Sequence, residues 1–131
     1  MRNKNLTTLK TIAIGSMFAM AVLAPSRNAL AQGAPRSFVA SPDIYKVIGE
    51  TEHYRVIAGT WKSGQRDQWH SHSLAGVYYV TDCHLRGYSP NGSSQEGSTK
   101  AGTRGVNNPV ASQSVENIGQ SECKLVLIEQ R

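Results

Sequence analysis

Two histidines separated by one residue, His70 and His72, have the clearest capacity for chemistry in this chain. In a β-strand, side chains at positions i and i+2 lie on one face, so both imidazoles could contact one metal ion or one ligand. A protein-bound transition metal usually has three or four protein ligands, so two histidines need partners from elsewhere. The function therefore depends on which residues complete the site.

The elements that must position these histidines read as β-strands. Six segments alternate with a period of two and are rich in Val, Ile, Tyr and Thr, with turn signals between them, and no segment after residue 31 has a helical period. This pattern predicts an all-β sandwich or barrel. The polar, glycine-rich stretch 92–108 is either a weak edge strand with loops or a mobile flap. The predicted strands are Ile44 to Ile48, Tyr54 to Trp61, Val77 to Thr81, Leu85 to Ser89, Val110 to Ile118 and Lys124 to Glu129.

The first 31 residues have the three parts of a secretory signal peptide. A basic start precedes the apolar run from Thr11 to Ala24, and Ala29-Leu30-Ala31 supplies small residues for cleavage. A membrane span needs roughly 20 apolar residues, and this run has 14. We expect cleavage before Gln32 and export to the periplasm or the medium, with no membrane attachment afterwards.

The charge of the chain changes when this segment is removed. Four of the 14 basic residues and none of the nine acidic ones lie in residues 1–31, which leaves ten against nine, or +1. The remaining basic residues are scattered singly, so a nucleic-acid partner is not expected. Residues 32–42 are predicted to be a flexible leader, and residues 43–131 one domain with a modest core.

The spacing of several residues resembles the two motifs of the cupin family. Gly64, five residues, His70, one residue and His72 follow the first motif, and Gln113 precedes Asn117 by the spacing of the second. The resemblance covers about residues 43 to 130. It implies a small single-domain cupin, an RmlC-like jelly-roll β-barrel, in a family that includes oxygenases, isomerases and ligand-binding modules.

Two positions depart from the family's metal-binding pattern. The resemblance places Gly76 at the position of the metal-binding glutamate and Gln113 at that of the last histidine. Glycine offers no ligand, and a neutral amide oxygen binds transition metals weakly. The metal set implied by the resemblance is therefore His70, His72 and Gln113, and the expected cofactor is at most a weakly bound divalent transition metal.

The same alternation predicts a polar cavity. If one strand continues through the histidines, Gln68 faces inward with them and Asp67 faces outward; on the next strand Tyr78 follows Gly76 inward. These side chains could bind a small polar or aromatic ligand, or could satisfy one another around ordered water. The predicted ligand-binding residues are Gln68, His70, His72, Tyr78 and Gln113.

The two cysteines, Cys83 and Cys123, leave two alternatives. In an exported protein they could form a disulfide that closes a loop of 40 residues, or they could be two partly buried free thiols.

Two hypotheses about function remain, and whether the protein is an enzyme stays open. The first is a non-catalytic cupin module that binds a small molecule, because no catalytic residues other than the incomplete metal set have a recognisable spacing. The second is a metal-dependent oxygenase or isomerase in which His70 and His72 hold the ion. Cupins often pair, so the resemblance also implies a homodimer.

Overall fold

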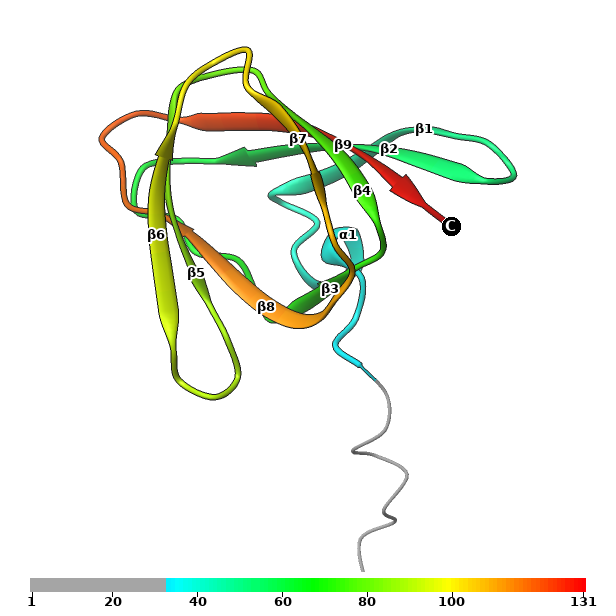
Figure 1. The fold of residues 1–131 in the computed structure, drawn as a ribbon, viewed down its shortest axis with the longest axis horizontal. Coiled ribbons are helices and arrows are strands. Elements are labelled where there is room, and N and C mark those ends of the chain that lie inside the picture. The colour runs from blue at the N-terminus through cyan, green and yellow to red at the C-terminus, as the bar shows by residue number, and fades with distance from the viewer. Residues whose placement is uncertain (1–32) are drawn as a thin grey trace, which may run out of the picture.

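The structure, a computed structural model, describes residues 33–131, which form nine strands and one short helix (Figure 1). The all-β prediction is therefore confirmed. The elements are α1 (Ser37–Ala40), β1 (Tyr45–Glu50), β2 (Tyr54–Trp61), β3 (His70–His72), β4 (Ala75–Tyr79), β5 (Cys83–Tyr88), β6 (Ser94–Thr99), β7 (Arg104–Asn107), β8 (Val110–Asn117) and β9 (Cys123–Gln130). No helix in residues 33–131 is long and apolar enough to cross a membrane.

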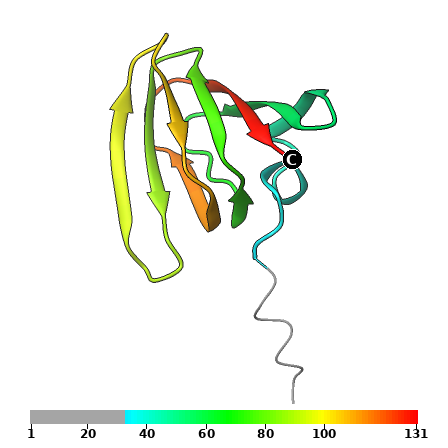
Figure 2. The ribbon, with the colours of Figure 1, turned by 45° about the vertical axis from the view of Figure 1, so that its right-hand side comes forward.

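The strands form two sheets, which face each other in a jelly-roll sandwich (Figures 1 and 2). One sheet has the order β1-β2-β9-β4-β7 and the other the order β3-β8-β5-β6. In the described range, β7 pairs only with β4 and β6 pairs only with β5. The predicted closed barrel is therefore wrong: the two edge strands do not join the sheets into one.

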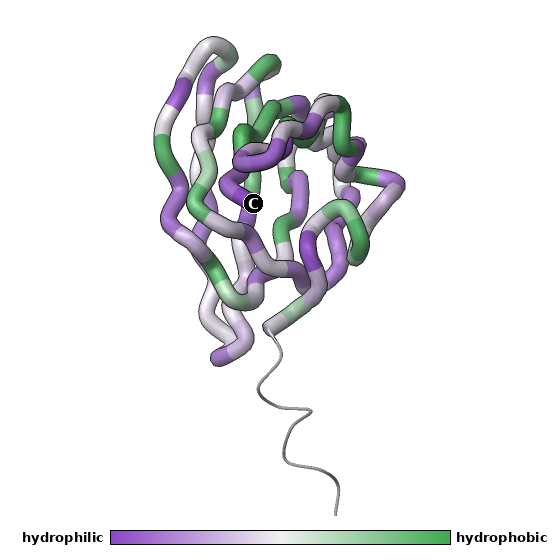
Figure 3. Tube along the Cα trace, turned by 90° about the vertical axis from the view of Figure 1, so that its right-hand side faces the viewer, coloured by the Kyte–Doolittle hydropathy of each residue, from purple (hydrophilic) through white to green (hydrophobic). Residues whose placement is uncertain are grey.

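The core lies between the two sheets. Strand β9 shows why: Cys123, Leu125 and Leu127 are buried, whereas Lys124 and Ile128 face outward, as a period of two requires. Figure 3 shows hydrophobic and hydrophilic residues interspersed along the strands. The buried apolar residues also include Ile44, Tyr45, Ile57, Trp61, Ala75 and Val77.

The segment 92–108 contains two edge strands, β6 and β7. They are joined by a turn in which Gly102 has a φ of 84°, a conformation that favours glycine. All four residues of β7 are exposed. Of the two alternatives for this segment, the edge strand is confirmed.

The expected flexible leader is instead ordered from Gly33 onward. The backbone N–H of Ser71 donates to the carbonyl of Pro35 (2.8 Å), and the Ser71 hydroxyl donates to the carbonyl of Ala34 (2.7 Å). The prediction of a flexible leader is wrong because β3 is an edge strand, whose free backbone groups are paired by this segment. The predicted signal peptide, residues 1–31, lies outside the described residues.

A disulfide joins the two sheets. Cys83 begins β5 and Cys123 begins β9, and their Cα atoms are 5.0 Å apart. Both residues are buried. The structure therefore has the disulfide rather than the two free thiols.

Candidate functional site

The two histidines of β3 lie side by side at one end of the core. Their ring centroids are 4.7 Å apart and the ring planes are nearly perpendicular. Both rings also contact Tyr45, with centroid distances of 5.2 Å for His70 and 5.9 Å for His72. The structure thus brings these two predicted site residues together on the inner side of the sheet.

His70 is fully buried, and both of its ring nitrogens have polar neighbours. Its Nδ1 lies 2.8 Å from the carbonyl oxygen of Gln68 and 3.5 Å from Oδ1 of Asp67. Its Nε2 lies 3.3 Å from the hydroxyl of Tyr45 and 3.5 Å from Nε2 of Gln113. His70 is therefore enclosed in a hydrogen-bonded network.

Asp67 is at the centre of that network, contrary to the sequence prediction. The side chain is buried, and its carboxylate accepts hydrogen bonds from the Tyr45 hydroxyl (2.8 Å), the indole N–H of Trp61 (3.3 Å) and the backbone N–H of Val115 (2.6 Å). The Tyr45 pKa is raised well above its ordinary value by burial, by the charge of Asp67 and by their hydrogen bond. Tyr45 thus stays a protonated donor to Asp67.

Gln68 is exposed, so its predicted place in the ligand site is wrong. The prediction assumed that the alternation of β3 extends back to residue 67. Strand β3 begins only at His70, and the irregular residues before it turn Asp67 inward and Gln68 outward. Only the backbone of Gln68 contributes, because its carbonyl oxygen holds the His70 ring.

His72 has a different environment, built around Glu129 of β9. Its Nδ1 lies 3.0 Å from Oε1 of Glu129, which also accepts a hydrogen bond from the backbone N–H of Ser73 (2.9 Å). The guanidinium of Arg36 lies 3.7 Å from the other carboxylate oxygen. Burial raises the pKa of Glu129, but the hydrogen bonds from His72 and Ser73 and the charges of His72 and Arg36 outweigh it, so the pKa is lowered.

The inward and outward faces of β4 are the reverse of the prediction. Ala75 and Val77 are buried, whereas Tyr78 is 47% exposed on the outer face. A Cβ added to Gly76 would meet nothing within 4 Å. The predicted inward orientation of Tyr78 is therefore wrong. Ala75, rather than Gly76, pairs with the buried Glu129 and shares its face.

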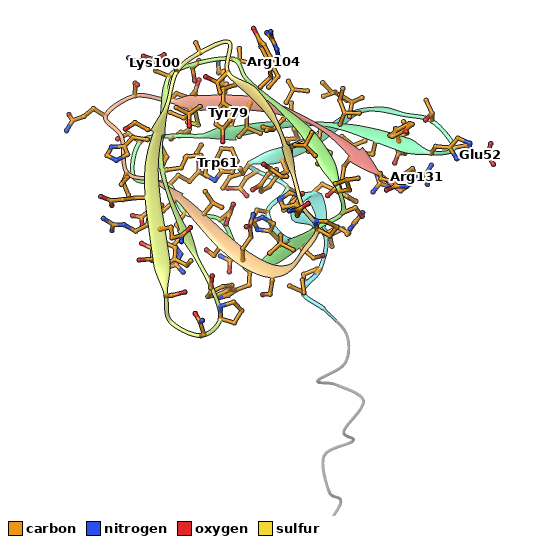
Figure 4. All side chains as sticks on the ribbon, in the orientation of Figure 1. Glu52, Trp61, Tyr79, Lys100, Arg104 and Arg131 are labelled. Carbon is orange, nitrogen blue, oxygen red and sulfur yellow. A yellow bond between two sulfur atoms is a disulfide. The ribbon has the colours of Figure 1, made fainter. Side chains whose placement is uncertain are left out.

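A cavity of about 280 Å³ lies beside the histidines, between the two sheets. His72 and Gln113 line it, as predicted, whereas the fully buried His70 does not. Figure 4 shows Trp61 and Tyr79 inside the space that the strands surround. The lining is polar at His72, Gln113, Asn107 and Asn108, aromatic at Tyr45, Trp61 and Tyr79, and aliphatic at Ala75, Leu85, Val110, Val115, Leu125 and Leu127.

The residues around the histidines do not fit a tightly held metal ion. Within residues 33–131, no three His, Cys, Asp or Glu side chains are grouped so that they could hold one. The two nearby carboxylates, Asp67 and Glu129, lie on the Nδ1 sides of the histidine rings. Two imidazoles and the amide of Gln113 form a weak donor set for transition metals.

The sequence reasoning missed the two carboxylates and Tyr45. For Glu129 a signal was present: it continues the alternation of Leu125 and Leu127, so it had to lie on the buried face of its strand. An acid in that position needs a buried partner. No comparable pattern indicated Asp67, because it lies in irregular backbone.

Comparisons with solved structures identify the fold. A cupin domain from Bordetella pertussis Tohama I is 23% identical, with a TM-score of 0.62, over 75% of this chain and 96% of that chain. A double-stranded β-helix protein from Klebsiella pneumoniae is 20% identical (TM-score 0.54, 66% of this chain and 75% of that chain). An RmlC-like cupin family protein from Methanocaldococcus jannaschii is 12% identical (TM-score 0.53, 66% and 78%).

The protein therefore has the fold of the small single-domain cupins. No family model matches the chain, and no curated protein matches its sequence. Since one cupin fold carries many functions, the activity must be argued from the site.

Proposed function

We propose that this protein is a small-molecule-binding module whose cavity takes a small polar or aromatic ligand without converting it. The observation that carries the proposal is the cavity of about 280 Å³ with His72 and Gln113 on its wall. Binding sites for small molecules are typically concave and largely apolar, with a few polar groups that orient the ligand. The aromatic and aliphatic lining described above, with its few polar side chains, has this composition.

Two neighbouring positions provide a test of this proposal. Ala75 lines the cavity, whereas Gly76 has open space on the outer face of the same strand. Ala75→Leu should fill part of the cavity, and Gly76→Leu should not. We expect small phenols and heterocycles, screened by NMR, to bind the wild type and Gly76→Leu and to lose at least about tenfold in affinity for Ala75→Leu. Equal binding by both variants would place the ligand elsewhere.

A metal-dependent oxygenase or isomerase is the second candidate function. One observation favours it: the Nδ1 atoms of His70 and His72 face a carbonyl and a carboxylate, an arrangement that orients metal-binding histidines through their other nitrogen. The weak donor set argues against it. Stoichiometric metal in protein purified from its native compartment, lost on replacing both histidines, would favour the enzyme.

We also propose that the protein is exported. The tripartite composition of residues 1–31 supports this, and the mature chain should begin at Gln32. N-terminal sequencing of protein recovered from the periplasm or medium tests the proposal. A chain that still starts at Met1 in a membrane fraction would contradict it.

A further inference from the structure

His72 offers one unused hydrogen-bonding atom to the cavity. Its side chain is only 9% exposed and lines the cavity wall. Nδ1 is held by Glu129, whereas Nε2 has no hydrogen-bond partner within the described part of the chain. This nitrogen is accessible from the cavity, where a polar group of a ligand could replace water as its hydrogen-bond partner.

The contact with Glu129 determines the kind of group that fits. Oε1 of Glu129 also accepts a hydrogen bond from the backbone N–H of Ser73 (2.9 Å), so it faces Nδ1 of His72 as an acceptor. Nδ1 of His72 must therefore carry the proton. In the neutral imidazole, Nε2 is then a hydrogen-bond acceptor that points away from Glu129, whereas in the imidazolium it is a donor, so a ligand that donates to Nε2 binds the neutral form. A ligand meets this atom best with an O–H or N–H donor.

The rest of the lining favours a ligand without charge. Among residues 33–131, no Lys, Arg, Asp or Glu lines the cavity. Arg36 and Glu129 lie behind His72 and partly balance each other. A charged ligand would lose its hydration without meeting an opposite charge on the wall, which is unfavourable.

The size of the cavity and the aromatic residues in its lining favour an aromatic body. An apolar cavity of about 150 Å³ can hold one benzene ring, so 280 Å³ accommodates a substituted ring. Trp61 and Tyr79 supply aromatic surface, and the leucines and valines of the lining supply aliphatic surface.

We propose that the cavity binds neutral hydroxylated aromatic molecules, of which phenol is the simplest, with the ligand hydroxyl donating its proton in a hydrogen bond to Nε2 of His72. This inference rests on the proposed ligand-binding function and specifies its ligand class. It assigns His72 as the residue that determines specificity, with Glu129 as the residue that positions it.

The test compares phenol with toluene, which has a methyl group in place of the hydroxyl. Affinities are measured by NMR titration for the wild type and for His72→Phe/Glu129→Gln, which keeps a ring and removes both the acceptor and the buried charge. We expect the preference for phenol over toluene to fall about tenfold in the double variant. The control is His53→Phe, since His53 is exposed and remote from the cavity lining; it should leave the preference unchanged.

The outcomes separate this inference from the proposed function. An unchanged preference in the double variant would overturn the role of His72 while leaving the cavity as a ligand site. Tighter binding of benzoate than of phenol would overturn the neutral class. If neither phenol nor toluene binds but a heterocycle of the screen does, this inference fails and the proposed function stands; if no compound binds, both fail. Should the double variant not fold, the ¹⁵N signal of His72 Nε2 in the wild type decides: it must shift with phenol and not with toluene.

Discussion

His70 and His72 are two residues apart on one strand, yet their environments differ in the property that matters for function. His70 is fully buried, and each of its ring nitrogens faces polar groups of the protein itself. His72 uses one nitrogen for Glu129, and its other nitrogen, beside the cavity, has no hydrogen-bond partner among residues 33–131. The comparison shows that, in a histidine pair with the spacing of a metal site, one residue can be structural while the other is available to a ligand.

Each histidine is accompanied by a buried carboxylate, and these also differ. Asp67 accepts hydrogen bonds from Tyr45, Trp61 and the backbone of Val115, so it ties three segments of the core together. Glu129 holds His72 and Ser73, and one of its oxygens has no hydrogen-bond partner in residues 33–131. We therefore expect the Asp67 cluster to govern stability and the Glu129 cluster to govern binding.

The largest expected effect is on stability. Asp67→Ala leaves the donors of Tyr45, Trp61 and Val115 without an acceptor, and we expect a loss of about 3 to 5 kcal/mol in the free energy of unfolding. Denaturant unfolding measures it. The control is Glu122→Ala, because the Glu122 carboxylate pairs with Lys124 at the surface; it should not change stability measurably. Equal effects would remove the structural role assigned to Asp67.

The second prediction concerns metal affinity and the orientation of β4. Ala75→Glu with Gln113→His adds an inward carboxylate and an imidazole next to His72, so we expect divalent metal to bind at least about 100-fold more tightly than in the wild type. Gly76→Glu with Gln113→His places its carboxylate on the outer face and should gain less. Calorimetric titration with Zn²⁺ distinguishes them. A larger gain from the Gly76 variant would mean that the faces of β4 are wrongly assigned.

The third prediction concerns the loss of stability at acid pH, which we expect to depend on Glu129, the partner of His72. Because the folded pKa of Glu129 is lowered, its contribution to stability is complete above the unfolded value of about 4.3 and is lost as the pH falls through the folded pKa. Glu129→Gln should therefore lose less stability than the wild type between about pH 5 and pH 3. The test is to measure the free energy of unfolding of both proteins across this pH range. An equal loss of stability in the wild type and in Glu129→Gln would contradict the prediction.

The smallest expected effect concerns the loss of stability at alkaline pH, which we expect to depend on Tyr45, a neighbour of His70. The pKa of Tyr45 is raised, so its contribution is complete below the unfolded value of about 10 and is lost as the pH rises through the folded pKa. Tyr45→Phe cannot ionise and should show a shallower loss of stability above about pH 10 than the wild type. If the free energy of unfolding fell equally above about pH 10 in the wild type and in Tyr45→Phe, the Tyr45 hydroxyl would not contribute to the alkaline loss of stability.

The sequence predicted the strands well because their alternation is continuous. The predicted range of β2 matches the structure, that of β8 is one residue too long at its end, and that of β9 is one residue too short at each end. It predicted the faces poorly where alternation is interrupted. Irregular backbone precedes β3, so Asp67 faces inward and Gln68 outward, the reverse of the prediction. The link between β3 and β4 shifts the alternation of faces by one residue, so Ala75 faces inward and Gly76 outward, again the reverse of the prediction.

The sequence by itself determined the all-β class, the cupin resemblance and the proximity of His70, His72 and Gln113. These follow from local patterns: period-two hydropathy and fixed spacing within the motifs. Only the tertiary structure decided which histidine faces the cavity and which carboxylate holds it. Glu129 reaches His72 across 57 positions of sequence through the packing of two sheets, and no local pattern specifies a contact of that kind.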